Sequence, residues 1–111
     1  MPRDVWIRGG ATIPTNLMPL TASRPLAELT ADDKGIDVSL SSKRSMWHVS
    51  WEELDHVLVG PRSMVLLPRL GRPCRFTLGS RRRLQPLTAL LNSRHIRTQQ
   101  VRSTMGWALK V

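Results

Sequence analysis

The chain has 111 residues, of which 41% are hydrophobic and 23% charged, and its formal net charge is +9. This size and apolar content predict one globular domain and exclude a disordered chain. No apolar run approaches the roughly 20 residues of a membrane-spanning helix, and the N-terminus lacks the apolar centre of a signal peptide, so we expect a cytoplasmic protein.

The charges are unevenly divided along the chain. Residues 1–58 contain six Lys or Arg and eight Asp or Glu, whereas residues 59–111 contain eleven Lys or Arg and no acidic residue. Such asymmetry suggests an anionic partner: a nucleic acid, a membrane headgroup or an acidic protein face. The alternative is that the acidic half folds against the basic half and neutralises it.

Residues 1–19 contain three prolines and the pair Gly9-Gly10, which disfavours a long helix and predicts an extended N-terminal arm or short edge strands. From residue 26 onward, short apolar runs alternate with turn-forming residues. This pattern predicts strands at 26–30, 36–40, 46–51, 55–59, 64–68 and 74–78.

The stretch 46–60 is the most regular part of this pattern. Trp47, Val49 and Trp51 alternate with polar or flexible residues, as in a half-buried strand. The pair Glu52-Glu53 interrupts the pattern, and an apolar run then resumes up to Gly60. We interpret the stretch as a strand, a polar corner and a second strand, with both tryptophans in the core.

The apolar period changes once, near the C-terminus. Leu84, Leu87, Leu90 and Leu91 have helical spacing and predict one helix within 81–94, which either begins near Pro86 or is kinked there. Residues 97–111 show no sustained period and are assigned to a C-terminal tail. The region 96–101 could add a strand, and the apolar residues beyond it could form a hook.

Taken together, the elements predict a mainly β (α+β) domain: an antiparallel bent sheet or open barrel of about six or seven strands, capped by one C-terminal helix. This architecture, with the corner Val49-Ser50-Trp51-Glu52-Glu53-Leu54-Asp55-His56-Val57, is similar to bacterial PH-like (pleckstrin-homology or GRAM-like) domains. The resemblance covers residues 20–96 and implies a non-enzymatic binding scaffold. Phosphoinositide-binding members use basic residues around the first hairpin loop, whereas the matching loop here is Asp32-Asp33-Lys34-Gly35.

Five arginines form the predicted anion or partner site: Arg72, Arg75, Arg81, Arg82 and Arg83. The run 81–83 precedes or opens the helix, where cations are disfavoured unless an anion lies nearby. The alternative is a solvated charge run, or pairing with the acidic residues at 52–55. Trp6 and Trp107 lie in irregular segments and are predicted partner anchors.

No catalytic or metal-binding constellation is expected. His48, His56 and His95 lack metal-ligand spacing, and Cys74 lies on an apolar strand face, where it behaves as a small hydrophobe. We expect no enzyme activity, cofactor or small-molecule substrate.

The leading functional hypothesis is a binding or adaptor protein that engages a protein partner. This partner is either a different protein or, in a homo-oligomer, a second copy of the same chain. The first alternative is arginine-driven nucleic-acid binding, although Phe76 is the single aromatic residue between residue 59 and the tail. The second alternative is peripheral binding to an anionic membrane, which no long basic amphipathic helix supports.

Overall fold

The computed structural model describes residues 5–14, 20–40, 45–78 and 81–102, with the backbone alone for residues 20, 22–25, 81 and 83. These residues form eight strands, one 3-10 turn and one α-helix. In chain order they are β1 (Val5–Ile13), β2 (Leu20–Ala31), β3 (Gly35–Leu40), β4 (Ser45–Ser50), β5 (Leu54–Val59), β6 (Ser63–Pro68), β7 (Cys74–Thr77), η1 (Arg81–Leu84), α1 (Gln85–Ser93) and β8 (Arg97–Gln100).

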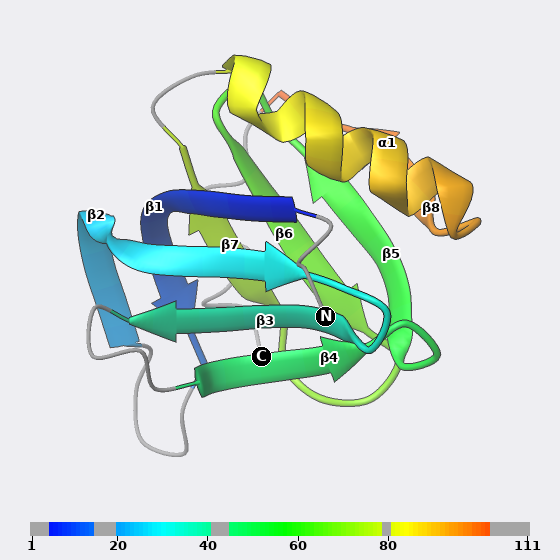
Figure 1. Cartoon of the computed structure of the whole chain (residues 1–111), viewed down its shortest axis with the longest axis horizontal. Coiled ribbons are helices and arrows are strands. Elements are labelled where there is room, and N and C mark those ends of the chain that lie inside the picture. Colours follow the sequence, from blue (N-terminus) through cyan, green and yellow to red (C-terminus); the bar gives the residue numbers. More distant parts are fainter. Residues whose placement is uncertain (1–4, 15–19, 41–44, 79–80, 103–111) are drawn as a thin grey trace.

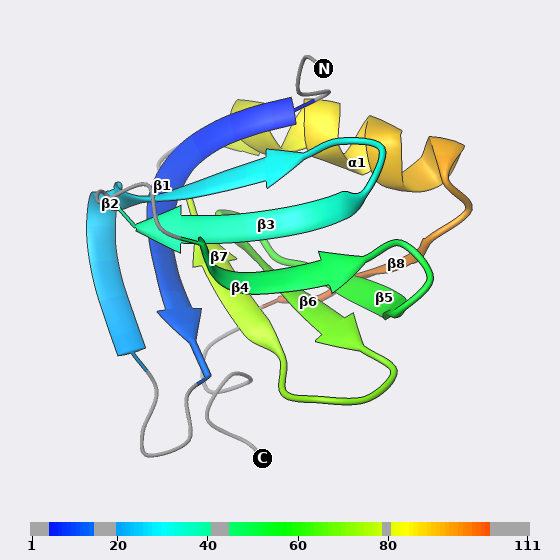
Figure 2. The same cartoon turned by 60° about the horizontal axis from the view of Figure 1, so that its bottom comes forward.

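The strands form one continuous sheet in the order β4-β3-β2-β1-β7-β6-β5-β8. All neighbours are antiparallel except β5 and β8, which are parallel. The sheet bends so that β1–β4 run across β5–β7, and α1 lies beside β8 and β1 at the open end (Figure 1; Figure 2). The predicted fold class, a mainly β open sheet capped by one helix, is therefore confirmed.

Strand β1 joins the two halves of the sheet. It pairs with β2 on one side and, through Gly10, Ala11 and Thr12, with β7 on the other. The register shifts between Gly9 and Ala11, where β1 passes from one half to the other. A Cβ atom on Gly9 would lie 2.1 Å from the carbonyl oxygen of Thr77, so the strands can approach this closely only with glycine there.

The position of β1 corrects the predicted N-terminal arm. Val5, Ile7, Ala11 and Ile13 are buried, so residues 5–13 are an internal strand rather than an arm or an edge. The clustered prolines and glycines obscured the strand pattern in the sequence. The apolar residues nevertheless alternate along β1, which allows one face of the strand to pack into the core. At the other end, residues 97–100 were assigned to the tail with an added strand left open, and they form edge strand β8.

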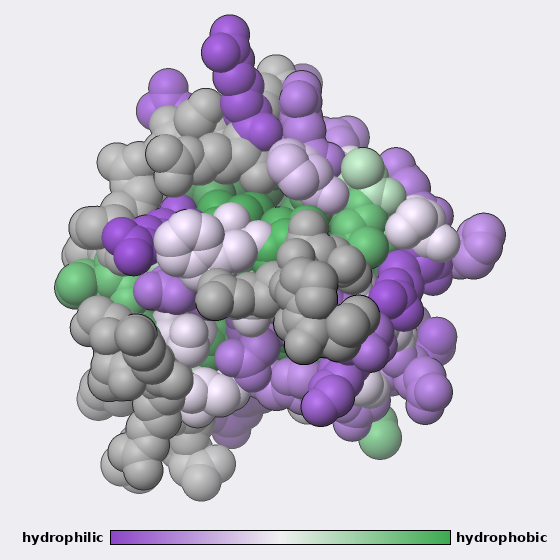
Figure 3. Space-filling model, viewed as in Figure 1, coloured by the Kyte–Doolittle hydropathy of each residue, from purple (hydrophilic) through white to green (hydrophobic). Residues whose placement is uncertain are grey.

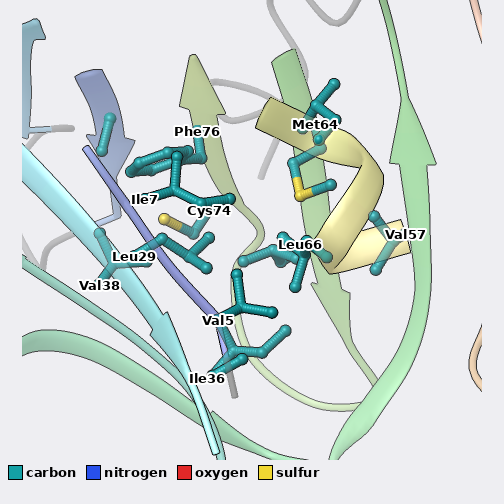
Figure 4. Close-up of a cluster of buried hydrophobic side chains, with 14 of the residues drawn as sticks. Val5, Ile7, Leu29, Ile36, Val38, Val57, Met64, Leu66, Cys74 and Phe76 are labelled. Carbon is teal, nitrogen blue, oxygen red and sulfur yellow. The ribbon is translucent and has the colours of Figure 1, made fainter. Parts of the chain in front are cut away.

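The core lies between the two halves of the bent sheet and α1. Side chains from β1, β2, β3, β5, β6 and β7 meet there (Figure 4), and Leu84, Leu87 and Leu91 close the open end. The helix prediction is borne out: η1 and α1 together span 81–93, and Pro86 lies in the first turn of α1. In the same view as Figure 1, hydrophobic atoms appear mainly near the middle of the molecule, with hydrophilic side chains around them (Figure 3).

Trp47 and Trp51 are partly buried and pack against the core instead of lying inside it. The indole N–H of Trp51 donates a hydrogen bond to the carbonyl oxygen of Asp32 (2.7 Å), and the Arg94 guanidinium lies 4.9 Å from the centre of the Trp51 ring. Trp51 thus connects the β2–β3 hairpin with the end of α1. Neither helical segment among the described residues has the length and apolar character needed to cross a membrane.

Candidate functional site

The acidic corner at residues 52–55 is used within the fold. The Glu53 carboxylate accepts hydrogen bonds from the backbone N–H (3.1 Å) and the hydroxyl (2.9 Å) of Ser50, which closes the turn between β4 and β5. These hydrogen bonds lower the pKa of Glu53. Glu53 therefore stabilises the corner itself.

Asp55 is where the acidic corner meets the basic half. Its carboxylate lies 2.6 Å from Nδ1 of His56, 3.4 Å from Arg69 and 3.8 Å from Arg97. The hydrogen bond to His56 and the nearby positive charges lower the pKa of Asp55. Because these groups are partly exposed, each pair contributes little stability, but Arg69 and Arg97 are held at an acidic residue.

Of the five predicted arginines, the structure describes the side chains of Arg72, Arg75 and Arg82. Arg72 precedes β7 and Arg82 follows it, so this strand, about 10 Å long at ~3.3 Å per residue, separates them. Arg75 lies within β7 opposite Thr12 and Val65, and burial lowers the pKa of its guanidinium. Arg81 and Arg83 belong to η1 by their backbone. Their role as an anion site stays a prediction.

Instead, Arg82 shares one end of the molecule with two arginines that the sequence did not single out. The N–H of Leu78, at the end of β7, donates to the carbonyl oxygen of Arg62 (2.7 Å). The N–H of Val101 donates to Val59 (2.9 Å), which places Arg102 beside the end of β5. We call the surface formed by Arg62, Arg82 and Arg102, which are all exposed, the basic end.

The carboxylates of the described residues lie away from the basic end. Asp55 is at the start of β5, about 13 Å from Val59 at its end, as four residues of extended strand dictate. Neither Arg62 nor Arg102 forms an ion pair with another described residue. The other described acidic residues belong to β2, β3, their connecting turn and the corner before β5: Glu28, Asp32, Asp33, Asp37, Glu52 and Glu53.

A groove of about 360 Å³ opens at the basic end, between α1 and the ends of β5 and β8. Its helix side has the spacing i, i+3, i+4 and i+7 of one helical face. The lining residues are Val59, Gly60, Leu84, Gln85, Thr88, Ala89, Asn92 and Gln100. The groove depends on β8 and on its parallel pairing with β5; the sequence allowed a strand within 96–101 but gave no signal for the parallel pairing.

A second, wider hollow of about 520 Å³ lies over β2, β3 and β4. Its polar groups mostly contact one another: Asp37 lies 3.4 Å from His48, and the Ser45 hydroxyl donates to Asp37 (2.6 Å). At its margin Glu28 accepts a hydrogen bond from the Trp6 indole N–H (3.0 Å) and lies 4.0 Å from Arg8. The lining carries three carboxylates (Glu28, Asp32 and Asp37) and one lysine (Lys34), so this hollow does not suit an anionic ligand.

Of the two predicted anchors, Trp6 lies on the outer face of β1 and is 47% exposed. Its ring is covered in part by Arg8, whose guanidinium lies 5.0 Å from the ring centre. Trp107 lies outside the described residues. An anchoring role for either tryptophan stays a prediction.

The reactive residue types are dispersed or buried. The described residues contain no group of three His, Cys, Asp or Glu side chains that could hold a metal ion. Cys74 is buried in the core, and burial raises the pKa of its thiol to about 12. No family model and no curated protein sequence matches this chain.

Proposed function

We propose that this protein is a small, non-enzymatic binding module on a PH-like scaffold, and that its basic end engages an acidic surface of a partner protein. The observation that carries the proposal is the separation of charge. Arg62 and Arg102 are exposed at one end of the molecule and form no ion pair with another described residue, whereas Arg69 and Arg97 lie beside Asp55. No described carboxylate therefore offsets the positive charge of Arg62 and Arg102, which leaves it for a partner.

The scaffold assignment is supported by the architecture, in which a bent antiparallel sheet is closed by one C-terminal helix. The same architecture leaves β4 and β8 as the terminal strands of the sheet, and unpaired strand edges are common docking sites for proteins. A protein partner is favoured over nucleic acid because none of the described residues that line the groove at the basic end is aromatic, so they offer no platform for base stacking.

The proposal is tested by comparing two variants that lose the same number of positive charges, one at the basic end and one elsewhere on the surface. R62Q/R82Q/R102Q and R69Q/R72Q/R97Q each remove three positive charges from exposed side chains, so both are expected to fold. Retention on heparin and on immobilised polyglutamate is expected to fall sharply for the first variant and only slightly for the second. The retention of R81Q/R82Q/R83Q is expected to lie between those of the first two variants, because Arg62 and Arg102 remain. Equal losses in the first two variants would show that total charge alone matters.

The alternatives give different outcomes. A gel shift of random DNA or RNA at micromolar protein, with steep salt dependence, would favour nucleic-acid binding; each arginine lost should then reduce the salt slope by about one unit. Co-sedimentation with anionic vesicles at physiological salt would favour membrane attachment. Absence of both, together with retention on polyglutamate, supports an acidic protein partner.

A further inference from the structure

The groove between α1 and the ends of β5 and β8 has a lining suited to a peptide main chain. Gln85, Asn92 and Gln100 supply three side-chain amides, each with donor and acceptor groups. These are the hydrogen-bonding groups that a peptide backbone itself presents. None of the described lining residues is charged, and Val59, Leu84 and Ala89 make part of the lining apolar.

The shape of the groove also fits a chain that passes along it. The helix side runs from Gln85 to Asn92, which is about 10 Å at ~1.5 Å per residue. An extended peptide advances ~3.3 Å per residue, so this length corresponds to about three residues. The groove lies open to solvent, whereas small-molecule sites enclose most of their ligand.

The basic end flanks this groove closely. Arg62, Arg82 and Arg102 each lie two residues along the chain from a lining residue, namely Gly60, Leu84 and Gln100. A chain in the groove would therefore carry its neighbouring side chains into the field of these arginines. Acidic side chains fit that field best.

We infer that the groove binds the main chain of an extended acidic segment of a partner protein, with the segment's carboxylates at the basic end. This inference rests on the proposed function, and it adds the conformation and chemistry of the partner. The amides select an extended α-peptide backbone, and the arginines select acidic side chains.

The experiment separates main-chain recognition from charge. Fluorescent decaglutamate in α-linked and γ-linked forms carries the same charge, but its backbone amides are spaced differently. The α-linked form is expected to bind at least about fivefold more tightly in fluorescence anisotropy, as one or two additional hydrogen bonds imply. Oligothymidylate of equal length serves as the nucleic-acid comparison.

The matched variants are Q100V and Q99V. Both sit on exposed positions of β8, but only Gln100 lines the groove, because successive side chains of a strand point to opposite faces. Q100V is expected to weaken binding of the α-linked peptide about fivefold and to leave the γ-linked peptide unchanged, whereas Q99V changes neither. A89E, which places a negative charge in the groove, should weaken binding of the α-linked peptide more than Q100V does.

The outcomes distinguish the two proposals. Equal binding of the α- and γ-linked peptides, or equal effects of Q100V and Q99V, would overturn the groove inference and leave the basic end as a general acidic contact. If the wild-type protein retains neither peptide, both proposals fail. Tighter binding of oligothymidylate than of either peptide would overturn the assignment of a peptide and favour nucleic acid.

Discussion

Replacing Gly9 by alanine tests how the two halves of the sheet are held together. The added Cβ would lie 2.1 Å from the Thr77 carbonyl oxygen and 3.0 Å from the Phe76 ring. Because the nearer contact is with backbone, β1 and β7 would have to move apart by about 1 Å. This movement strains the β1–β7 ladder, which comprises three residue pairs.

Overpacking of this kind costs about 1–3 kcal/mol, and one or two weakened backbone hydrogen bonds cost about 1 kcal/mol each. We therefore expect G9A to lower the free energy of unfolding by about 2–5 kcal/mol and Tm by roughly 8–20 °C. Urea unfolding followed by tryptophan fluorescence and circular dichroism measures this change. Agreement of the two signals checks that unfolding remains two-state.

G71A is the contrasting variant. Gly71 has a φ of +105°, but a Cβ there would meet its nearest neighbour, Pro68, at an ordinary 3.7 Å. Its cost is therefore backbone strain alone, about 1–2 kcal/mol. The explanation for Gly9 would be refuted if G9A were within about 0.5 kcal/mol of the wild type, the usual range for a harmless substitution, or if G71A were the more destabilised variant.

Three further predictions concern single side chains. W51F removes the hydrogen bond to Asp32 and should lower the free energy of unfolding by about 1 kcal/mol, whereas W47F, which removes no hydrogen bond to a described residue, should cost less in the same urea titration. Cys74, whose thiol pKa is raised to about 12 by burial, should react with a disulfide reagent at pH 8 only as fast as the protein unfolds; immediate stoichiometric labelling would contradict its burial. The pKa of Asp55 is lowered in the folded state, so its contribution to stability is present above the unfolded pKa of about 3.9 and is lost as the pH falls through the folded pKa. D55N should therefore show a flatter decline of stability than the wild type between pH 6 and pH 3, and parallel curves would exclude this role.

Much of the fold could be predicted because the local signals agree with one another. The hairpin turn at Asp32–Gly35 is closed by a bond from the Asp32 N–H to Gly35 (3.0 Å), and the corner at Glu53 is closed by Ser50. Pro86 fits the first turn of α1, where its missing N–H costs nothing. Each of these features depends on residues close together in the sequence.

A strand within 96–101 was among the sequence-based expectations, but its parallel pairing with β5 and the basic end were missed, because both depend on contacts distant in the sequence. β8 has the sequence Arg-Thr-Gln-Gln, with no apolar alternation, and its strand conformation follows from parallel pairing with β5 after the chain has crossed over α1. The basic end was missed for the same reason, since Arg62, Arg82 and Arg102 are brought together by three separate connections.

The pairing of β1 with β7 also has a consequence for how the protein forms. Strand β1 borders both halves of the sheet, but its second neighbour, β7, is synthesised only after β2, β3, β4, β5 and β6. Until then, one side of β1 has unpaired backbone groups and an incomplete core. Contacts between residues this distant in the sequence slow folding and prolong the exposure of an unpaired strand edge that can associate with other chains. We therefore expect the nascent chain, more than the finished protein, to be the form that is prone to aggregate.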